Sequence, residues 1–428
     1  MEYMTKLTRT QDKNIQVGID VGSSKFCCAI AEINPSNQNV KLLGIGSSSS
    51  TGIKKGSIIH RDKIIEEMEK AVTDAEIMAD IKVNRAWLTI SGEHVRGINT
   101  QGAIAIQKSG QSPSATDQEI QIEDVYKVLE LAKAISFPVD RNILHTLPQE
   151  YIIDTMTGIK DPVGMSGRRL EGRVHLVTVA TSSASNFINC AEELGISVDG
   201  LVFQGLASSI ATIDKDEKEL GVAVVDIGAG TTDIVVYFDG GVRHTGVIPI
   251  GADSITNDIA VMLQVGKNEA EEIKLKYASA KASMASPELE FELPVKNGGI
   301  SRKISEHELS RYVEARMTEI LQLISREISR ADIHQKLTYG LVFTGGGAQL
   351  SNLAGLAEET LNIRARIGAP KGISGVVDVA STPHYAAAIG LIQWPVNIQD
   401  VQQVLSPFGG VTAKNVANQI YRWFKQFF

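Results

Sequence analysis

Two segments of the chain place an aspartate, glycines and hydroxyl residues directly after a run of apolar residues. The first reads Ile15-Gln-Val-Gly-Ile-Asp-Val-Gly-Ser-Ser-Lys25 and the second reads Val222-Ala-Val-Val-Asp-Ile-Gly-Ala-Gly-Thr-Thr-Asp233. Glycine and small residues let backbone N–H groups approach a phosphate chain closely, and hydroxyl groups add further donors. The hydroxyl residues are Ser23, Ser24, Thr231 and Thr232. Asp20 and Asp226, at the ends of the apolar runs, suit a Mg²⁺ ion that keeps most of its water.

The two segments also have similar surroundings. Each reads as a strand, a glycine-containing turn and a second strand, and Asp20 and Asp226 lie 206 positions apart. This repeat indicates two similar halves with a nucleotide between them. An ordinary β-hairpin explains either segment alone, but two copies with matching flanks favour a shared site.

A third glycine cluster, Gly345-Gly-Gly-Ala348, follows the apolar run Leu341-Val-Phe-Thr344. Apolar residues at helical spacing come next: Leu350, Leu353, Leu356 and Ala357. A flat base or its sugar could lie against such a backbone, and a bare turn is the other explanation. The sequence has no G-x-x-x-x-G-K-[ST] motif and no G-x-G-x-x-G at a strand-to-helix junction. It also lacks H-E-x-x-H and G-x-S-x-G, so zinc and serine hydrolases have no support.

The overall composition is that of a globular protein with several domains. Its 428 residues, 43% of them hydrophobic, suffice for two to four domains at roughly 100–200 residues each. A formal charge of −8 argues against a nucleic-acid partner. The N-terminus lacks an apolar signal region, and no stretch reaches the roughly 18 apolar residues of a membrane-spanning helix. Cys27, Cys28 and Cys190 form neither a disulfide framework nor a zinc site, which fits a reducing cytoplasm.

The C-terminal segment differs from the rest of the chain. Residues 401–428 hold three basic and no acidic residues, so residues 1–400 carry a formal charge of −11. From Lys414 onward, apolar residues recur at helical spacing and form one stripe. They are Val416, Ile420, Trp423, Phe424, Phe427 and Phe428. Basic residues beside aromatic ones predict an interfacial helix over 414–428 for anionic lipids, after a linker over 396–413. A helix docked on the protein's own core is the alternative.

The order of the glycine turns resembles that of the actin, sugar kinase and Hsp70 superfamily. Longer segments are similar to the FtsA family of bacterial cell-division proteins. They are Thr51-Gly-Ile-Lys-Lys-Gly56, Ser91-Gly-Glu-His-Val95, Leu147-Pro-Gln-Glu-Tyr-Ile-Ile-Asp154, and the stretch 158–171 with Val174-His-Leu176. The resemblance covers residues 15–395 and extends to the tail. It implies an α/β protein with the actin-like two-lobed ATPase fold, a relocated 1C subdomain and a C-terminal amphipathic helix.

The resemblance also implies subdomain limits. Subdomain 1A takes residues 13–92, 170–204 and 374–395, 1C takes 93–169, 2A takes 205–253 and 330–373, and 2B takes 254–329. Within 1C, the stretch Ser109–Thr116, rich in serine, glycine and proline, predicts a mobile loop. Within 2B, apolar residues at three-to-four spacing predict a helix independently of the resemblance. They are Ile304, Leu309, Tyr312, Val313, Met317, Ile320, Leu321 and Ile324.

For the site, the resemblance implies ATP and Mg²⁺ in a cleft between the lobes. The implied nucleotide-binding residues are Asp20, Gly22, Ser23, Ser24, Lys25, Asp226, Gly228, Ala229, Gly230, Thr231, Thr232, Glu271, Lys274, Gly345, Gly346, Gly347 and Ala348. Asp20 and Asp226 would hold the metal through water. Glu271 and Lys274 match a helix that reaches the ribose and base, and a surface ion pair is their other explanation. Lys25 as a solvated turn lysine also stays open.

Gln204 opens a segment similar to the connection between the lobes in this superfamily. The match makes it the candidate catalytic residue, as a group that orients water. An amide cannot take a proton, and positioning alone gives a smaller rate gain than a placed general base. We therefore expect at most a slow ATPase, and a structural role at the start of a helix is the alternative for Gln204.

The implied function is an actin-like protein that polymerises on the cytoplasmic face of the bacterial cell membrane, at the division septum. Its tail would anchor the division ring, and 1C would recruit later division proteins. The ring partner would be the C-terminal peptide of the tubulin-like protein FtsZ, with Arg316 of 2B at a partner-binding position. A solvated helix arginine is the alternative for Arg316. An actin-fold phosphotransferase or phosphatase, or a pilus-assembly scaffold, are the other functions left open.

Overall fold

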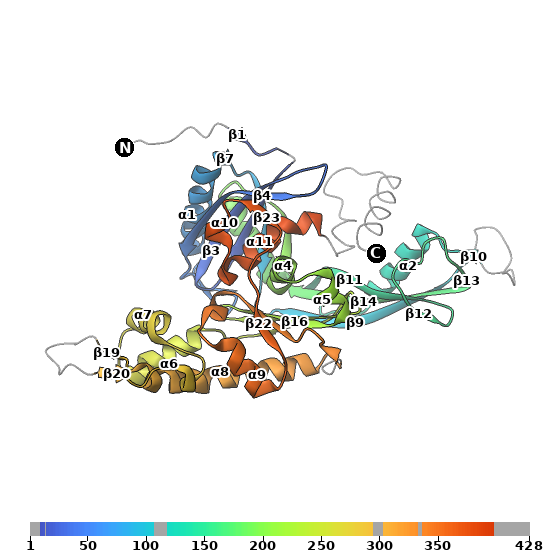
Figure 1. Cartoon of the computed structure of the whole chain (residues 1–428). Coiled ribbons are helices and arrows are strands. Elements are labelled where there is room, and N and C mark those ends of the chain that lie inside the picture. Colours follow the sequence, from blue (N-terminus) through green and yellow to red (C-terminus); the bar gives the residue numbers. More distant parts are fainter. Residues whose placement is uncertain (1–8, 13, 107–117, 294–302, 333–335, 398–428) are drawn as a thin grey trace.

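The chain folds as a mixed α/β protein with two lobes and a third, projecting subdomain (Figure 1). The computed structural model describes residues 9–12, 14–106, 118–293, 303–332 and 336–397. The predicted loop Ser109–Thr116 and the predicted tail helix over 414–428 lie outside the described residues. Among the described helices, none combines the length and the apolar character that crossing a membrane requires.

The first lobe is built on a six-stranded sheet. In spatial order its strands are β15 (Ser197–Phe203), β8 (Arg85–Ile90), β2 (Ile15–Val21), β3 (Lys25–Ile33), β4 (Val40–Ser49) and β23 (Ile373–Gly375). Four helices accompany it: α1 (Arg61–Ala79), α3 (Thr181–Glu193), α4 (Gln204–Thr212) and α11 (Ala386–Gln393). Side chains alternate along β3, because successive residues of a strand point to opposite faces. Cys28 and Ile30 join the core with α1, whereas Cys27 and Ala29 face α11.

The second lobe is built on a five-stranded sheet. Its spatial order is β18 (Gly241–Ile248), β17 (Thr232–Phe238), β16 (Val222–Ile227), β21 (Leu341–Thr344) and β22 (Ala365–Ile367). Its helices are α5 (Lys215–Leu220), α6 (Asp253–Leu263), α7 (Lys267–Tyr277), α8 (Glu306–Ser329) and α9 (Leu353–Leu361). Every residue of β16 is buried, as expected of a strand covered on both faces.

Two details of the second lobe correct the sequence prediction. The long helix α8 begins at Glu306, where the hydroxyl oxygen of Ser305 accepts a hydrogen bond from Glu308 N–H. Ile304 therefore lies outside the helix, in strand β20 (Lys303–Ser305), which pairs with β19 (Glu290–Glu292). Leu350 likewise precedes α9, because a short 3-10 turn over Gly346–Gln349 separates the glycine cluster from that helix.

The projecting subdomain is a four-stranded antiparallel sheet with one covering helix. Its spatial order is β12 (Met156–Ile159), β11 (Arg141–Ile153), β14 (Arg169–Ala180) and β9 (Val95–Ala105), and the helix is α2 (Ile122–Lys133). Apolar residues of α2 pack against this sheet in a core of their own. We call this unit the insert. The 1C limit at residue 169 falls at the start of β14, which pairs with both β9 and β11.

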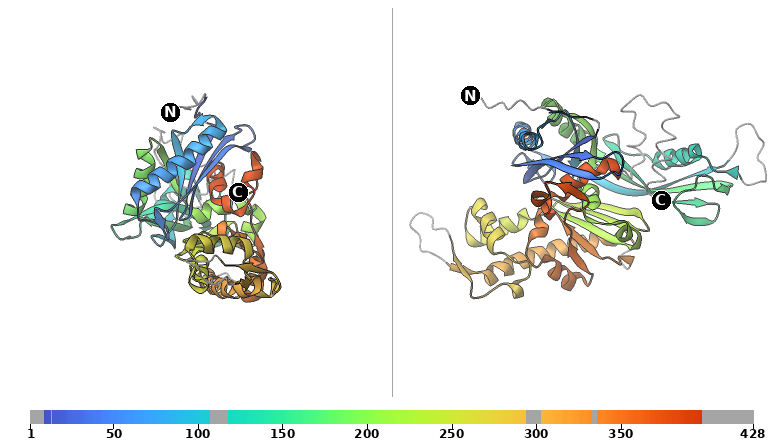
Figure 2. Two further views of the ribbon diagram at one scale, coloured as in Figure 1. Left: turned by 90° about the vertical axis from the view of Figure 1, so that its left-hand side faces the viewer. Right: turned by 45° about the horizontal axis from the view of Figure 1, so that its top comes forward.

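The remaining elements are short. They are β1 (Arg9–Thr10), β5 (Ile53–Lys54), β6 (Ser57–Ile58), β7 (Ile81–Lys82), β10 (Gln118–Glu119), β13 (Ser166–Gly167), α10 (Val377–Ala380), and the 3-10 turns Ala282–Met284, Pro383–Tyr385 and Trp394–Val396. Figure 2 shows that the insert reaches out to one side of the molecule. It also shows that α6, α7 and α8 form the outer part of the second lobe.

Candidate nucleotide-binding cleft

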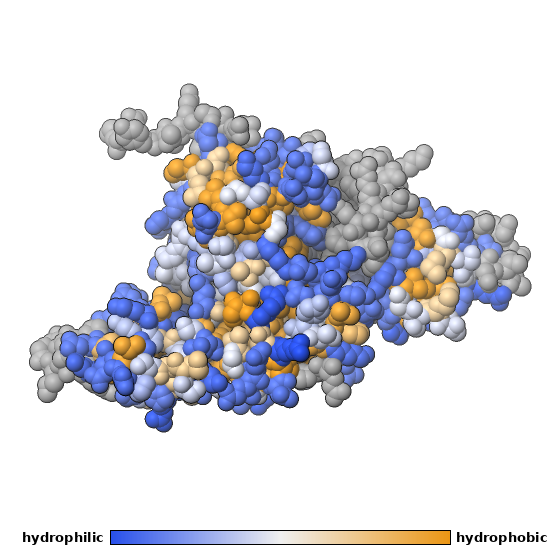
Figure 3. Space-filling view, viewed as in Figure 1, coloured by the Kyte–Doolittle hydropathy of each residue, from blue (hydrophilic) through white to orange (hydrophobic). Residues whose placement is uncertain are grey.

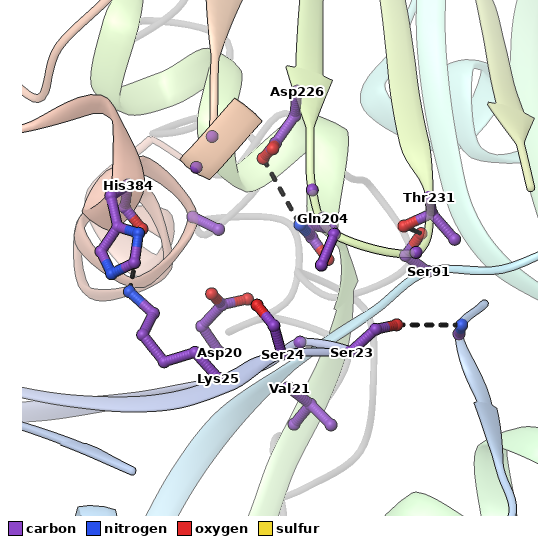
Figure 4. Close-up of a pocket in the computed structure, with 18 of the residues that line it drawn as sticks. Asp20, Val21, Ser23, Ser24, Lys25, Ser91, Gln204, Asp226, Thr231 and His384 are labelled. Carbon is purple, nitrogen blue, oxygen red and sulfur yellow. Dashed lines mark hydrogen bonds between the residues drawn. The ribbon is translucent and has the colours of Figure 1, made fainter. Parts of the chain in front are cut away.

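A solvent-open cavity of about 580 Å³ lies where the two lobes meet. It is lined by Asp20, Val21, Gly22, Ser23, Ser24, Lys25, Gly56, Ser91, Gln204, Asp226, Gly228, Ala229, Gly230, Thr231, Gly345, Gly346, Pro383, His384 and Ala387. Most residues of the two predicted turns therefore meet at one place, and Figure 4 shows them facing one another.

The first turn joins β2 to β3 and holds Asp20 inside the protein. Asp20 is 6% exposed, and Thr89 Oγ1 donates a hydrogen bond of 2.8 Å to its Oδ1. Burial raises the pKa of Asp20, because the charged carboxylate loses its water, while nearby Lys25 lowers it. The turn closes through the N–H of Gly22, which donates to the carbonyl oxygen of Lys25 at 3.0 Å. Ser23 Oγ accepts a bond of 3.3 Å from Gly56 N–H across the cavity wall.

The second turn joins β16 to β17, and Asp226 stands at its start with 2% of its surface exposed. Ser208 donates its hydroxyl to Oδ2 of Asp226, and Gln204 Nε2 donates to the same oxygen at 3.5 Å. The other oxygen, Oδ1, is buried and has no hydrogen-bond partner among the described residues. Gly345 passes close to it, with φ at +82°, and a Cβ there would lie 2.1 Å from Oδ1. Only glycine fits this position beside the carboxylate.

The two aspartates make the inner end of the cavity suitable for a cation. Burial raises the pKa of Asp226 to about 6, and the negative charge of Asp20 adds to the rise. A cation between the carboxylates would offset both effects. Within the described ranges, no cluster of three or more histidine, cysteine, aspartate or glutamate side chains could hold a metal alone. The donor set therefore fits Mg²⁺ shared with water and phosphate oxygens, which needs few protein carboxylates.

Lys25 provides the positive charge of the cavity. Its ammonium group donates to the carbonyl oxygen of His384 at 3.0 Å and lies 4.0 Å from the centre of the Tyr385 ring. Burial lowers the pKa of Lys25, while Cys27, Asp20 and Asp226 act in the opposite direction. A partly desolvated ammonium group beside a cavity is well placed to attract an anion. The interpretation as a freely solvated turn lysine does not fit this environment.

Hydrogen bonds between side chains of the two lobes connect the lobes at the edge of the cavity. Ser91, which follows β8 of the first lobe, donates from Oγ to Asp233 Oδ1 at 2.6 Å and lies 3.2 Å from Thr231 Oγ1. Asp233 is fully buried, and burial raises its pKa well above 3.8, with the charge of Asp226 adding to the rise. Sequence reasoning assigned no role to these contacts, although Ser91 and Asp233 both lie in the segments it singled out.

His384 is a cavity residue that the sequence did not indicate. It precedes Tyr385 in a 3-10 turn, and burial lowers its pKa to about 4, with nearby Lys25 contributing. The carbonyl oxygen of Pro383 accepts the N–H of Gly345 at 3.1 Å, which fixes this turn against the glycine cluster. No sequence motif surrounds His384. It reaches the cavity only because folding brings its turn against the distant glycine cluster.

Five of the predicted nucleotide-binding residues lie outside the cavity lining: Thr232, Glu271, Lys274, Gly347 and Ala348. Thr232 donates its hydroxyl to the carbonyl oxygen of Ile250 at 2.8 Å. Gly347 and Ala348, the last two residues of the glycine cluster, are buried. Glu271 and Lys274 lie on the same face of α7 and form an ion pair of 2.7 Å with each other. Lys274 Nζ also donates to Thr256 Oγ1 on α6 at 2.9 Å, so this pair packs α7 against α6.

Arg316 lies on α8 and is not among the residues that line the cavity. Its guanidinium forms a two-pronged ion pair with Asp258 of α6, at 2.5 Å from Nε to Oδ2 and 3.0 Å from Nη2 to Oδ1. Glu319, one turn along α8, pairs with its Nη1. Arg316 is therefore not the simple solvated arginine of the alternative interpretation, because two carboxylates of this chain already engage it.

Solved structures share this architecture. The PilM-PilN type IV pilus biogenesis complex matches with a TM-score of 0.62 and 15% identity, over 88% of this chain and 97% of that chain. The ADP-bound crystal structure of MreB5 of Spiroplasma citri matches with a TM-score of 0.52 and 14% identity, over 92% and 98%. At such identities the likeness concerns the fold alone. Together, the two lobes and the paired turns define this chain as a protein of the actin-like ATPase fold.

Sequence comparison narrows this class. A model described as "Cell division protein FtsA" matches residues 223–390, and a model of the SHS2 domain inserted in FtsA matches residues 92–178. The chain belongs to the FtsA family of cell division proteins. It is 35% identical to cell division protein FtsA of Pseudomonas aeruginosa over 422 residues, which are 97% of this chain and 99% of that relative. The predicted family and fold are thereby confirmed.

Proposed function

We propose that this chain binds ATP with Mg²⁺ in the cavity between its lobes and polymerises on the cytoplasmic face of the cell membrane. There it would anchor the FtsZ ring at the division septum and recruit later division proteins. The observation that carries the proposal is the meeting of both aspartate turns around one cavity, in a chain of the FtsA family. The ADP held by MreB5 supports a nucleotide in this fold.

Each wall of the cavity would have its own task. The backbone N–H groups of the turns 22–25 and 228–231 would face the phosphates, and Lys25 would add a positive charge. Asp20 and Asp226 would hold Mg²⁺ through water, and Oδ1 of Asp226, which is buried without a hydrogen-bond partner among the described residues, would be available for that purpose. Magnesium, when bound, neutralises phosphate charge. Gly345 and Gly346 would lie against the adenosine.

Gln204 lines the cavity beside Asp226, and we propose it as the residue that would orient water. Its amide already donates toward Asp226 Oδ2, and it cannot accept a proton from water. Ser208 also donates a hydrogen bond to Oδ2. This carboxylate oxygen is therefore already hydrogen-bonded and is poorly placed to accept a proton from water. We infer that the site favours holding the nucleotide over hydrolysing it, with at most slow turnover.

The outer surfaces support the assembly role. Val376, directly before α10, and Val379, within it, are exposed, and Figure 3 shows apolar side chains gathered on this part of the first lobe. Exposed apolar side chains of this kind favour contact with another protein, for which a second copy of the chain is our proposal. Arg316 would contact the FtsZ peptide, the insert would contact later division proteins, and residues 414–428 would contact anionic lipids.

One experiment tests membrane attachment and ring binding together. Full-length protein is sedimented with anionic liposomes and a labelled peptide from the FtsZ C-terminus, with and without ATP and Mg²⁺. We expect peptide to appear in the pellet only with this protein, and more of it when ATP is present. Peptide that stays in the supernatant while the protein pellets would contradict the ring partner. Phosphate release that depends on an added small acceptor would instead support an actin-fold enzyme.

A further inference from the structure

The insert belongs to the first lobe by chain connection but is hydrogen-bonded to the second lobe. Strand β9 follows β8, and β14 leads into α3, so both ends of the insert enter the first lobe. Its sheet nevertheless lies against β18, the edge strand of the second-lobe sheet. Figure 1 shows β9, β11 and β14 reaching outward from the region where the two lobes meet.

His175 of β14 is at the centre of this contact. Its Nδ1 lies 2.7 Å from Asn99 Oδ1, and its Nε2 lies 2.8 Å from Thr245 Oγ1 on β18. Because the amide oxygen of Asn99 can only accept, Nδ1 carries the proton and Nε2 accepts from the threonine hydroxyl. Burial lowers the pKa of His175 to about 3, which agrees with this neutral ring. All three polar groups are thus satisfied across the two subdomains.

Two further side chains of the insert donate to the backbone of β18. Gln149 Nε2 donates to the carbonyl oxygen of Val242 at 2.7 Å, and Asn99 Nδ2 donates to that of Arg243 at 3.0 Å. The approach is so close that Gly97 of β9 must lack a side chain. A Cβ there would lie 2.3 Å from Thr245 Oγ1. We call this set of contacts, with His175 and Thr245, the β18 junction.

A second histidine connects the insert to the cavity from the side of the first lobe. His145 of β11 is fully buried, and its Nε2 accepts the backbone N–H of Phe203 at 3.0 Å. Phe203 directly precedes Gln204, whose side chain lines the cavity. The ring of His145 packs against that of Trp394, with centroids 5.3 Å apart. The insert therefore holds the start of α4 in place.

Both contacts end on elements that lead to the cavity. Thr245 pairs with Val235 of β17, and β17 begins directly after the turn Gly228–Thr231. We propose that the insert bridges the two lobes through the β18 junction and His145, and so couples its own position to the state of the cavity. The proposal rests on the proposed nucleotide function. A partner that binds the insert would then change nucleotide affinity, and the nucleotide would change the affinity for that partner by the same factor.

Amide hydrogen exchange of the full-length protein, with and without ATP and Mg²⁺, tests this coupling. We expect ATP to slow exchange in the turns 20–25 and 226–232, and also in β9 and β14 by about fivefold, the lower end of typical coupling between sites. Thr245→Val removes the hydroxyl without changing the shape of the side chain. It should abolish the effect of ATP on β9 and β14 while leaving the effect on the turns.

Thr100→Val is the matched control, since Thr100 lies on β9 and its hydroxyl has no hydrogen-bond partner among the described residues. It should behave as the wild type. Gln149→Met provides a second test of the β18 junction if Thr245→Val does not fold. Slowed turns without any change in β9 and β14, or an unaltered insert response in both junction variants, would overturn the coupling alone. Turns that do not respond to ATP would overturn the nucleotide function and the coupling together.

Discussion

At the scale of single residues, Asp226 restricts most strongly what the cavity can hold. Its Oδ2 is engaged by Ser208 and Gln204, whereas its Oδ1 is buried without a partner among the described residues. A buried carboxylate oxygen in this state costs free energy unless a ligand satisfies it. The neighbouring Asp20 adds repulsion, so a cation is the ligand that would relieve both costs.

Replacing the carboxylate by an amide should therefore separate metal-dependent from metal-independent binding. We expect Asp226→Asn to weaken ATP binding by roughly tenfold in the presence of Mg²⁺, equivalent to about 1.4 kcal/mol. Without Mg²⁺, the variant should bind ATP at least as tightly as the wild type, because the amide does not repel the phosphates. Titration of a fluorescent ATP analogue, with and without Mg²⁺, measures both. Asp199→Asn, at a surface ion pair with Arg85, is the control and should bind like the wild type. An unchanged Mg²⁺ dependence in Asp226→Asn would contradict the assigned role.

The pKa of Asp226 gives a second prediction, for the nucleotide-free protein. Because the folded-state pKa is about 6 and the ordinary value is 3.8, the folded state binds the proton more tightly than the unfolded state. The free energy of unfolding should then fall as pH rises from about 4 to about 6, by up to about 3 kcal/mol from this group. Asp226→Asn should flatten that dependence and be the more stable protein above pH 6. Urea unfolding at several pH values measures this, and parallel curves for both proteins would refute it.

At the scale of elements, the sequence predicted hairpins well and contacts between elements poorly. The turns around Asp20 and Asp226 follow from local pattern, since apolar runs and glycine spacing specify a strand, a turn and a strand. Helix α8 was predicted by its apolar spacing, but its start was wrong, because the serine cap at Ser305 outweighs the apolar Ile304. The histidines of the insert could not be predicted. His145 and His175 bond to Phe203 and Thr245, which lie 58 and 70 positions further along the chain. Only the tertiary fold brings these residues together.

The pairing of α6 with α8 yields a prediction about the ring partner. Arg316 is engaged by Asp258 and Glu319, so an acidic peptide must compete with these carboxylates for the guanidinium. Arg316→Glu should weaken binding of the FtsZ C-terminal peptide by at least about tenfold. Asp258→Asn should instead tighten it by a few fold, since it removes one competing charge. Fluorescence anisotropy of the labelled peptide measures both affinities.

Because the two variants should change peptide affinity in opposite directions, they distinguish a role of Arg316 in peptide recognition from a purely structural role. Either change breaks the same ion pair between α6 and α8, so a purely structural effect would weaken peptide binding in both. Melting temperatures with ATP provide the control and should show the same ATP response in each protein. Equal peptide affinity for wild type and Arg316→Glu would contradict the assignment of Arg316.

At the scale of the whole molecule, the three proposed functions fall at separate places on one chain. The cavity lies between the lobes, Arg316 lies on α8 of the second lobe outside the cavity lining, and the predicted membrane helix follows residue 397 beyond the described part of the chain. Such separation would allow one protein to hold nucleotide, ring peptide and membrane at once. The apolar surface at α10, with Val376 and Val379, would add contact between copies.

Assembly should then decide how tightly the membrane is held. Burying a large apolar side chain contributes about 1.5–3 kcal/mol at most, and an interfacial helix buries each only in part, so one tail should bind weakly and reversibly. In a filament the first inserted tail places the others at high effective concentration, which raises overall binding by about 10²–10⁴-fold.

Trp423→Glu puts a charge inside the apolar stripe and should release the protein from anionic liposomes in a flotation assay, with ATP binding intact. Asn418→Glu adds the same charge on the opposite face of the predicted helix and should release far less. Wild-type binding that is equally tight at concentrations below and above the onset of polymerisation would show that membrane attachment does not depend on assembly.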